Sequence, residues 1–385
     1  MKAFSSSVLA AATASLFLIC TVSAQFDNEV SLDFFDVDIE ESEDIGFTEA
    51  RNGFPPCNGF PEYRKIPINQ AFYLGAHDAG SDAFSTATSC HSTQSNDVSQ
   101  MLQDGIRYLD FNLCKNQDDM TVCSSFDGTP STTTFKDILE KIFLFARENV
   151  EQFFILNIRS ENVAEPINIK ELETTIDKIC KFHTEHTVGT DEFVEKECPF
   201  IYTHTPGKGH WPSMGELVNF DPDMAQWEGD GELVGVRTKF MITASSDVIS
   251  TPGYKSAYIT SSFWRSLPKE KENLKKELQK VCRIPAGGIG LELHSTSSTC
   301  VQDDITPDML EDLLLSRSGC NLNDSPLNTF FTFISIDHYD KHLPYLQELE
   351  RRMMDVNYAK WNGNYELLAP SVFTTKDKKV ARDEL

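Results

Sequence analysis

The chain alternates short apolar runs with longer stretches in which apolar residues recur at helical spacing. The short runs have the length and the β-branched and aromatic content expected of buried strands. They cover residues 70–77, 106–114, 152–160, 200–205, 239–245 and 330–339. The helix-like stretches cover residues 132–150, 262–282 and 343–361. This alternation, sustained over roughly 300 residues, predicts an α/β fold with a parallel sheet that is either open or closed into a barrel.

The stretch 132–150 has the clearest helical pattern. Its apolar residues recur at the spacing of one helix face, at Phe135, Ile138, Leu139, Ile142 and Ala146. Thr134 precedes this pattern, and Asp137 follows three residues later, which resembles a capping pair. We therefore expect an amphipathic helix that starts near Thr134.

The two ends of the chain resemble sorting signals. Residues 1–24 have a charged start, a short apolar run and small residues before Gln25, as in a cleavable signal peptide. That run is shorter than the ~20 residues of a membrane-spanning helix, and no other window is apolar enough to be one. Residues 25–55 form an acidic, solvated leader. Residues 373–385 form a polar tail that ends in Arg382-Asp383-Glu384-Leu385, similar to the retrieval signal of the endoplasmic reticulum.

These ends predict a protein of the secretory pathway, with the lumen of the endoplasmic reticulum favoured over secretion and a retrieval receptor as partner. The main domain then covers residues 56–372. The formal charge of −25 opposes nucleic-acid binding and simple docking on anionic membranes, and leaves transient contact with a membrane surface open.

Cysteine usage fits the same compartment. The chain has 10 cysteines, one of which, Cys20, leaves with the signal peptide. The others lack the spacing of a zinc site, so disulfides are favoured. Their odd number leaves at least one free or intermolecular thiol. Three pairs are close in sequence, Cys114 with Cys123, Cys180 with Cys198 and Cys282 with Cys300, but sequence does not determine the pairing.

Polar residues gather directly after several predicted strands, where barrel enzymes build their active sites. The set comprises His77, Asp78, Arg107, Asp110, Asn112, Asn157, Arg159, Glu161, Asp337 and His338. Spacing alone does not separate catalytic residues from charged residues that pair with helix ends. The question is which of them converge on His77.

Several segments resemble, in order and spacing, the phosphatidylinositol-specific phospholipase C X-domain-like phosphodiesterases, and most of all their secreted fungal and plant branch. The segments are "CNGFPEYRK…FYLGAHDAG", "QMLQDGIRYLDFNL", "TVCSSFDGTPSTTTFKDILEKIFLFARENVEQFFILNIRSE", "HWPSMGELV" and "FFTFISIDHYD". The resemblance covers about residues 56 to 345. It implies a (β/α)8-type barrel, often imperfectly closed, which agrees with the alternation of strands and helices.

The resemblance also implies roles. In this family one histidine, oriented by an aspartate, takes a proton from a substrate hydroxyl that attacks its own phosphodiester, and a second histidine protonates the leaving alkoxide. A cation, either an arginine or calcium, neutralises the developing charge. His77 matches the base and Asp337 matches the carboxylate that orients it.

The chain departs from the family pattern at three positions. Ser124, in "CSSFDG", stands where the acid histidine of a "CHSFGG"-like stretch is expected, and Asp78 matches the partner of that histidine. Asn112 stands where other members carry a phosphate-binding arginine or an acidic calcium ligand. Arg159 replaces a lysine or an acidic metal ligand, which suits phosphate binding without a metal.

Two functions remain open. The first is a phosphodiesterase of the phospholipase C type, in which Asp78, with a pKa raised by burial, is a substitute acid. The second is a pseudoenzyme that binds a phosphorylated ligand or lipid headgroup through Arg107 and Arg159. His77 and Asp337 favour the enzyme, which we prefer, whereas Ser124 and Asn112 favour the binding protein.

The predicted site residues fall into two groups. The catalytic residues are His77, Asp337, Asp78 and Arg159, and the substrate-binding residues are Arg107, Asp110, Asn112 and Ser124. Neither a metal nor another cofactor is expected. If only the acid is missing, Ser124→His should help a natural lipid diester more than a diester with an activated leaving group.

Overall fold

A computed structural model describes much of the segment between residues 57 and 363. The described ranges are 57–84, 91–117, 119–149, 151–188, 198, 200–204, 210–218, 227–228, 232–233, 238–245, 248, 256–266, 276, 280, 287–293 and 329–363. All of them fall in one unit, Glu49–Leu385. The predicted signal peptide, acidic leader and terminal tail lie outside the described residues, as do Cys90, Cys282, Cys300 and Cys320.

Eight parallel strands form the central sheet, in the order β10-β11-β12-β1-β2-β5-β8-β9. Their bounds are β1 Tyr73–Ala76, β2 Tyr108–Asn116, β5 Phe154–Arg159, β8 Phe240–Ala244, β9 Ile259–Ser261, β10 Trp264–Ser266, β11 Gly287–Leu293 and β12 Thr329–Ile336. Within the described ranges no pairing joins β9 to β10, so the curled sheet stays open there. The predicted α/β fold, an imperfectly closed (β/α)8-type barrel, is confirmed.

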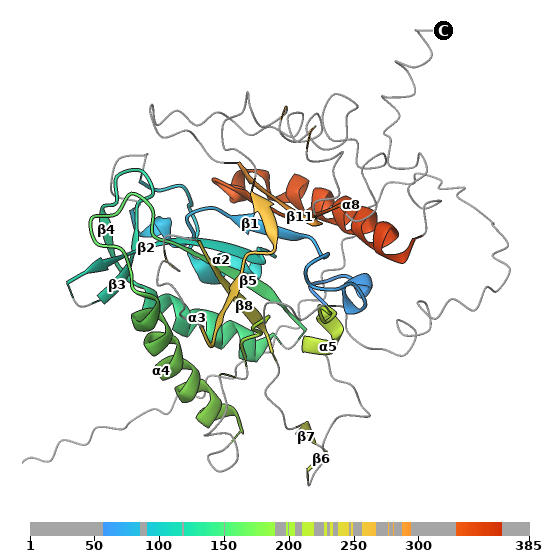
Figure 1. Ribbon diagram of the computed structural model, residues 1–385, viewed down its shortest axis with the longest axis horizontal. Coiled ribbons are helices and arrows are strands. Elements are labelled where there is room, and N and C mark those ends of the chain that lie inside the picture. The colour runs from blue at the N-terminus through green and yellow to red at the C-terminus, as the bar shows by residue number, and fades with distance from the viewer. Residues whose placement is uncertain are drawn as a thin grey trace, which may run out of the picture. The chain divides into compact units, whose positions relative to one another are not determined.

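Helices follow or precede these strands as an α/β fold requires (Figure 1). They are α2 Val98–Gln103, α3 Phe135–Glu148, α4 Ile169–Val188, α5 Met214–Val218 and α8 Leu343–Asn362, with 3-10 turns η1 Pro61–Arg64, η2 Ser81–Phe84 and η3 Tyr339–His342. The predicted cap of α3 is confirmed, because the side chain of Thr134 accepts a hydrogen bond of 3.1 Å from the backbone N–H of Asp137. Two short antiparallel additions are β3 Asp119–Cys123 with β4 Pro130–Thr134, and β6 Trp227–Glu228 with β7 Glu232–Leu233.

Three predicted elements differ from the structure. Residues 200–205 do not form a strand where they are described, and only Ile201 bridges to Phe240. The predicted helix 262–282 is wrong at its start, since Trp264–Ser266 is strand β10. Strand β11 was not predicted, because its sequence is rich in glycine.

Successive side chains along each strand point alternately to the two faces of the sheet. One face packs on α3, α4 and much of α8 and carries Leu74, Ala76, Leu109, Phe111, Leu156 and Ile158. The other, called the inner face below, carries Tyr73, Tyr108, Ile155, Met241 and Phe333. There the rings of Tyr108 and Phe333 stack with centroids 3.7 Å apart. Toward the carboxyl ends of the strands the same face becomes polar, and this polar layer is the candidate site.

Candidate active site

The register of the strands brings six residues of the predicted polar set together. In β2 and β5, Asp110 pairs with Asn157 and Asn112 pairs with Arg159. In β1 and β12, Ala76 pairs with Ile336, so that the next residues, His77 and Asp337, emerge side by side. All these side chains belong to the carboxyl ends of parallel strands, where the prediction placed them.

His77 and Asp337 form a direct hydrogen bond of 2.8 Å between Nδ1 and Oδ1. Both residues are buried. The backbone is fixed beneath them, because the side chain of Gln94 donates to the carbonyl oxygens of His77 at 2.7 Å and of Ile336 at 2.8 Å. The contact predicted between base and orienting carboxylate is therefore present, on a rigid support.

The surrounding charges favour protonation of His77. Burial by itself lowers the pKa of an imidazole, but the carboxylates of Asp78 and Asp337 outweigh burial, and the pKa of His77 is raised above its ordinary value. Asp337 also accepts the Nδ1 proton, which leaves Nε2 as the nitrogen that takes up a further proton. This is the tautomer that a general base requires.

Arg159 lies at the centre of three carboxylates. Its Nη2 donates to Asp78 at 2.7 Å, its Nε to Asp110 at 2.9 Å and its Nη1 to Glu161 at 3.0 Å. Burial lowers its pKa, but the carboxylates, Asp110 first, raise it well above the ordinary value. The guanidinium therefore stays charged and neutralises part of a strongly acidic layer.

A second line of hydrogen bonds extends this layer across the inner face. The side chain of Asn157 donates to Asp110 at 2.9 Å, and Thr243 on β8 donates to Asn157 at 2.8 Å. Asp110 is 1% exposed. Its Oδ1 accepts from both Asn157 and Arg159, so Asp110 holds these two side chains in place.

Asp78 links the arginine to His77. Its Oδ1 lies 3.6 Å from His77 Nε2 and also accepts from Arg159, while its Oδ2 accepts from the hydroxyl of Ser125. The residue has φ 49, a left-handed backbone that aspartate tolerates better than most residues. A proton on Asp78, which the role of substitute acid requires, would weaken its ion pair with Arg159.

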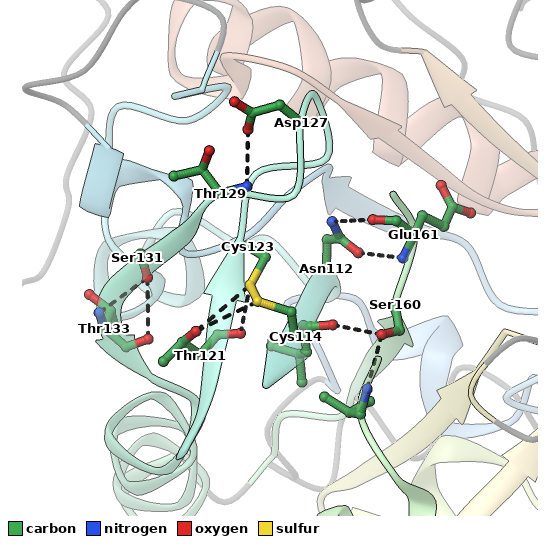
Figure 2. Close-up of a disulfide and its surroundings, with 12 residues drawn as sticks. Asn112, Cys114, Thr121, Cys123, Asp127, Thr129, Ser131, Thr133, Ser160 and Glu161 are labelled. Atoms are coloured by element: carbon green, nitrogen blue, oxygen red, sulfur yellow. Dashed lines mark hydrogen bonds between the residues drawn. A yellow bond between two sulfur atoms is a disulfide. The ribbon is translucent and has the colours of Figure 1, made fainter. Parts of the chain in front are cut away.

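The side chain of Asn112 forms hydrogen bonds with backbone atoms (Figure 2). Its side-chain amide donates to the carbonyl of Glu161 at 3.1 Å and accepts from the N–H of Glu161 at 2.8 Å. The residue is fully buried. Asn112 thus fixes the segment that carries the third carboxylate around Arg159.

The prediction that Arg107 shares this site is wrong. Arg107 precedes β2, and its side chain donates to the carbonyl of Leu102 at 2.6 Å and to Gln152 at 2.9 Å. Its guanidinium carbon lies 5.4 Å from the ring centre of Phe145 on α3. The reason is the two-residue period of a strand: Arg107 shares the helix-covered face with Leu109, whereas Asp110 and Asn112 point to the inner face.

Ser124 directly follows β3. The Cys114–Cys123 disulfide ties the end of β3 to β2 (Figure 2). The loop that begins at Ser124 is closed by hydrogen bonds from Ser124 N–H to the carbonyl of Thr129 at 2.9 Å and from Gly128 N–H to the carbonyl of Ser124 at 2.8 Å. A second disulfide joins Cys180 to Cys198. The expectation of disulfides is confirmed for these two pairs.

The sequence analysis missed His91. Its Nδ1 lies 3.2 Å from the hydroxyl of Ser124 and 3.4 Å from the carboxylate of Asp127. The one signal we find is the tripeptide Cys90-His91-Ser92, which repeats the start of the family's acid-histidine stretch at another position. Strand spacing gave no reason to connect it with Ser124.

In the described part of the chain, no group of three histidine, cysteine or carboxylate side chains has the geometry of a metal site. Asp78, Asp110 and Glu161 each bind Arg159 instead. Among the described helices, none is long and apolar enough to cross a membrane.

No family model matches the chain, and no curated protein matches it. Solved structures do resemble it. The phosphatidylinositol-specific phospholipase C from Listeria monocytogenes is 13% identical, with a TM-score of 0.48 over 74% of this chain and 94% of that chain. A mutant of the phosphatidylinositol-specific phospholipase C from Staphylococcus aureus is 11% identical, with a TM-score of 0.41 over 72% of this chain and 89% of that chain. At these identities the likeness is one of fold alone.

Proposed function

We propose that the protein is a phospholipase C-like phosphodiesterase of the secreted fungal and plant type, with an inositol phospholipid as the favoured substrate class. The observation that carries the proposal is the hydrogen bond between His77 and Asp337 at the carboxyl ends of adjacent parallel strands. A buried imidazole held by a carboxylate, with a raised pKa, is suited to general base catalysis.

The base acts through Nε2 of His77. Asp337 holds the Nδ1 proton, so Nε2 accepts the proton of a substrate hydroxyl as that hydroxyl attacks the neighbouring phosphorus. Asp337 then stabilises the imidazolium that forms. Base catalysis of this kind typically contributes ~10²–10⁴ in rate.

Arg159 supplies the positive charge without a calcium ion in this proposal. A guanidinium has five N–H donors, and the three carboxylates take one nitrogen each. Among the described residues no hydrogen bond is seen to the other two N–H groups, and the proposal assigns these to a phosphate oxygen. Asp78, Asp110 and Asn112 then act on the substrate indirectly, by holding Arg159 and its third carboxylate partner, Glu161.

The pseudoenzyme hypothesis loses support at one residue. It relied on Arg107 and Arg159 as two phosphate-binding cations, and Arg107 lies on the opposite face of β2. Without Arg107, that hypothesis rests on one cation in place of two, whereas the base and its orienting carboxylate, His77 and Asp337, are in direct contact. We therefore prefer the enzyme.

Turnover of two substrates tests the proposal. One is an inositol phosphodiester with a 4-nitrophenyl leaving group, and the other is phosphatidylinositol in detergent micelles. We expect wild type to cleave the aryl diester, His77→Gln to lose that activity, and His210→Gln, at an exposed histidine, to keep it. If wild type binds inositol phosphate but cleaves neither substrate, the enzyme proposal fails and the pseudoenzyme takes its place.

We also propose that the protein resides in the endoplasmic reticulum, from the signal-like start and the terminal Arg382-Asp383-Glu384-Leu385. Removal of these four residues should send the protein to the medium, as measured by immunoblot of cells and medium. Equal secretion with and without them would refute the retrieval signal.

A further inference from the structure

We infer that His91 is the general acid of the proposed reaction and protonates the oxygen that leaves phosphorus. The inference rests on the proposed function and adds a residue to it. Ser124 occupies the position expected for an acid, but a hydroxyl is too weak an acid to protonate an alkoxide. The structure places the imidazole of His91 directly beside that hydroxyl, at 3.2 Å.

The contacts of His91 orient its ring. Nδ1 faces both Ser124 Oγ and, at 3.4 Å, the carboxylate of Asp127. The ring lies between two aromatic side chains, with centroids 6.1 Å from Phe84 and 5.8 Å from Phe126. Within the described residues, no side chain or carbonyl binds Nε2. This nitrogen is therefore the one presented to a substrate, as Nε2 is in His77.

Two routes tie His91 to the end of β1. Along the chain, Thr93 donates to the carbonyl of His77 at 3.3 Å, two residues after His91. Through space, Ser125 follows Ser124 and donates to Asp78, whose Oδ1 lies 3.6 Å from His77 Nε2. Both histidines are thus connected to the end of β1, and the inference requires that a phosphodiester bound at Arg159 contacts both of them.

Asp127 gives His91 a carboxylate partner. Burial raises the pKa of Asp127, but its hydrogen bonds with Thr129 and the charge of His91 outweigh burial and lower it. Asp127 is thus a carboxylate at neutral pH, and it lies on the Nδ1 side of the ring, 3.4 Å away. A carboxylate on that side favours a ring orientation in which Nε2 faces away from the loop.

The other candidate acids are less suitable. Asp78 is held in an ion pair with Arg159, which a proton on its carboxylate would weaken. His338 follows Asp337, but burial and then the charge of Lys341 lower its pKa, so it is neutral at pH 7. His91 is the histidine at this strand end that combines a carboxylate partner with partial exposure, its side chain being 15% exposed.

In the proposed reaction each histidine transfers one proton. The substrate hydroxyl oxygen forms a bond to phosphorus and its proton passes to His77 Nε2. The bond from phosphorus to the leaving oxygen breaks, its electron pair stays on that oxygen, and the Nε2 proton of His91 is transferred to it. The products are a cyclic phosphodiester and an alcohol. Proton exchange with water then returns His77 to the neutral form and His91 to the protonated form.

His91→Gln, compared with the surface variant His210→Gln, tests the inference on the same two substrates. The alkoxide of phosphatidylinositol needs a proton to leave, whereas 4-nitrophenolate does not. We therefore expect His91→Gln to slow phosphatidylinositol cleavage by about 10²-fold or more and aryl cleavage by only a fewfold. Melting temperatures verify that both variants fold.

Ser124→His provides an independent arm. If the acid were missing, this substitution should accelerate lipid cleavage; if His91 is the acid, it should bring no gain, because it removes the hydroxyl beside Nδ1. Equal losses on both substrates in His91→Gln, or no loss on either, would overturn the inference while leaving the base and the proposed function intact. Wild type that cleaves neither substrate would overturn both.

Discussion

The two histidine–carboxylate pairs of this protein are built in different ways. His77 and Asp337 emerge from adjacent strands, 2.8 Å apart, with side chains 4% and 6% exposed. His91 and Asp127 belong to segments outside the strands, 3.4 Å apart, with side chains 15% and 42% exposed. The first pair is held in place by the hydrogen bonds of the sheet, and the second by contacts between its loops and neighbouring residues.

The difference matches the work that each pair is proposed to do. A base that must meet one hydroxyl benefits from strand ends whose positions vary little. An acid that must follow leaving groups of different shape benefits from a loop, where the backbone adjusts at smaller cost. The loop is still constrained, by the Cys114–Cys123 disulfide and by the hydrogen bond of 3.1 Å from Asn162 to the carbonyl of Ser125.

The largest expected effect comes from removing the charge beneath the buried pair. Arg159→Met leaves the buried carboxylates of Asp78 and Asp110 without their cation. We expect the free energy of unfolding at pH 7 to fall by about 3–5 kcal/mol. Protonation removes the charge of an unpaired buried carboxylate, so part of this loss should be recovered as the pH falls.

Urea unfolding at several pH values measures this effect, with Arg351→Met as the matched control. Arg351 contacts Glu348 and Asp355 on the surface of α8, and its loss should cost at most about 1 kcal/mol. If both variants lose the same free energy of unfolding, the carboxylates around Arg159 do not depend on its charge for stability, and the prediction is wrong.

A smaller effect is expected from the carboxylate that orients the base. The raised pKa of His77 depends on Asp78 and Asp337, and the base works only when neutral, so kcat/KM should rise with pH through that pKa. Asp337→Asn lowers the pKa of His77. The rise should therefore move to lower pH, while the plateau falls by up to about 10²-fold.

A pH profile on the aryl substrate checks this, with Asp340→Asn, the carboxylate three residues further on, as control. We expect Asp340→Asn to leave the profile in place. A plateau that falls in Asp337→Asn without any displacement along the pH axis would mean that Asp337 positions the ring without setting its pKa.

Much of the strand-borne site could be predicted from the sequence, because strand ends converge by topology. Placing His77, Asp110, Arg159 and Asp337 required only that their strands be parallel neighbours. Arg107 was misplaced because its parity along β2 was not counted: it lies three positions before Asp110, and an odd offset puts the two side chains on opposite faces.

The pair formed by His91 and Asp127 could not be predicted from the sequence, for a different reason. His91 and Ser124 are 33 residues apart and meet only through tertiary packing. Strand β11 was missed because Gly288 and Gly290 carry no strand signal. A Cβ at Gly290 would lie 2.3 Å from the ring of Phe333. Glycine is therefore required there by a residue distant in the sequence, which the local sequence does not reveal.

The smallest expected effect tests how firmly the loop pair is held. Gly128, next to Asp127, has φ +72, and a Cβ there would lie 2.2 Å from the carbonyl oxygen of Asn162. Gly105 has φ +93 with nothing within 4 Å of a Cβ, so Gly105→Ala reports the backbone strain without a collision.

Each alanine should cost roughly 1 kcal/mol of stability from its positive φ. Only Gly128→Ala should also displace Asp127, and with it slow phosphatidylinositol cleavage several-fold more than aryl cleavage. If the two variants behave alike on both substrates, the contact between Gly128 and Asn162 does not position the acid, and the loop holds His91 through Ser124 alone.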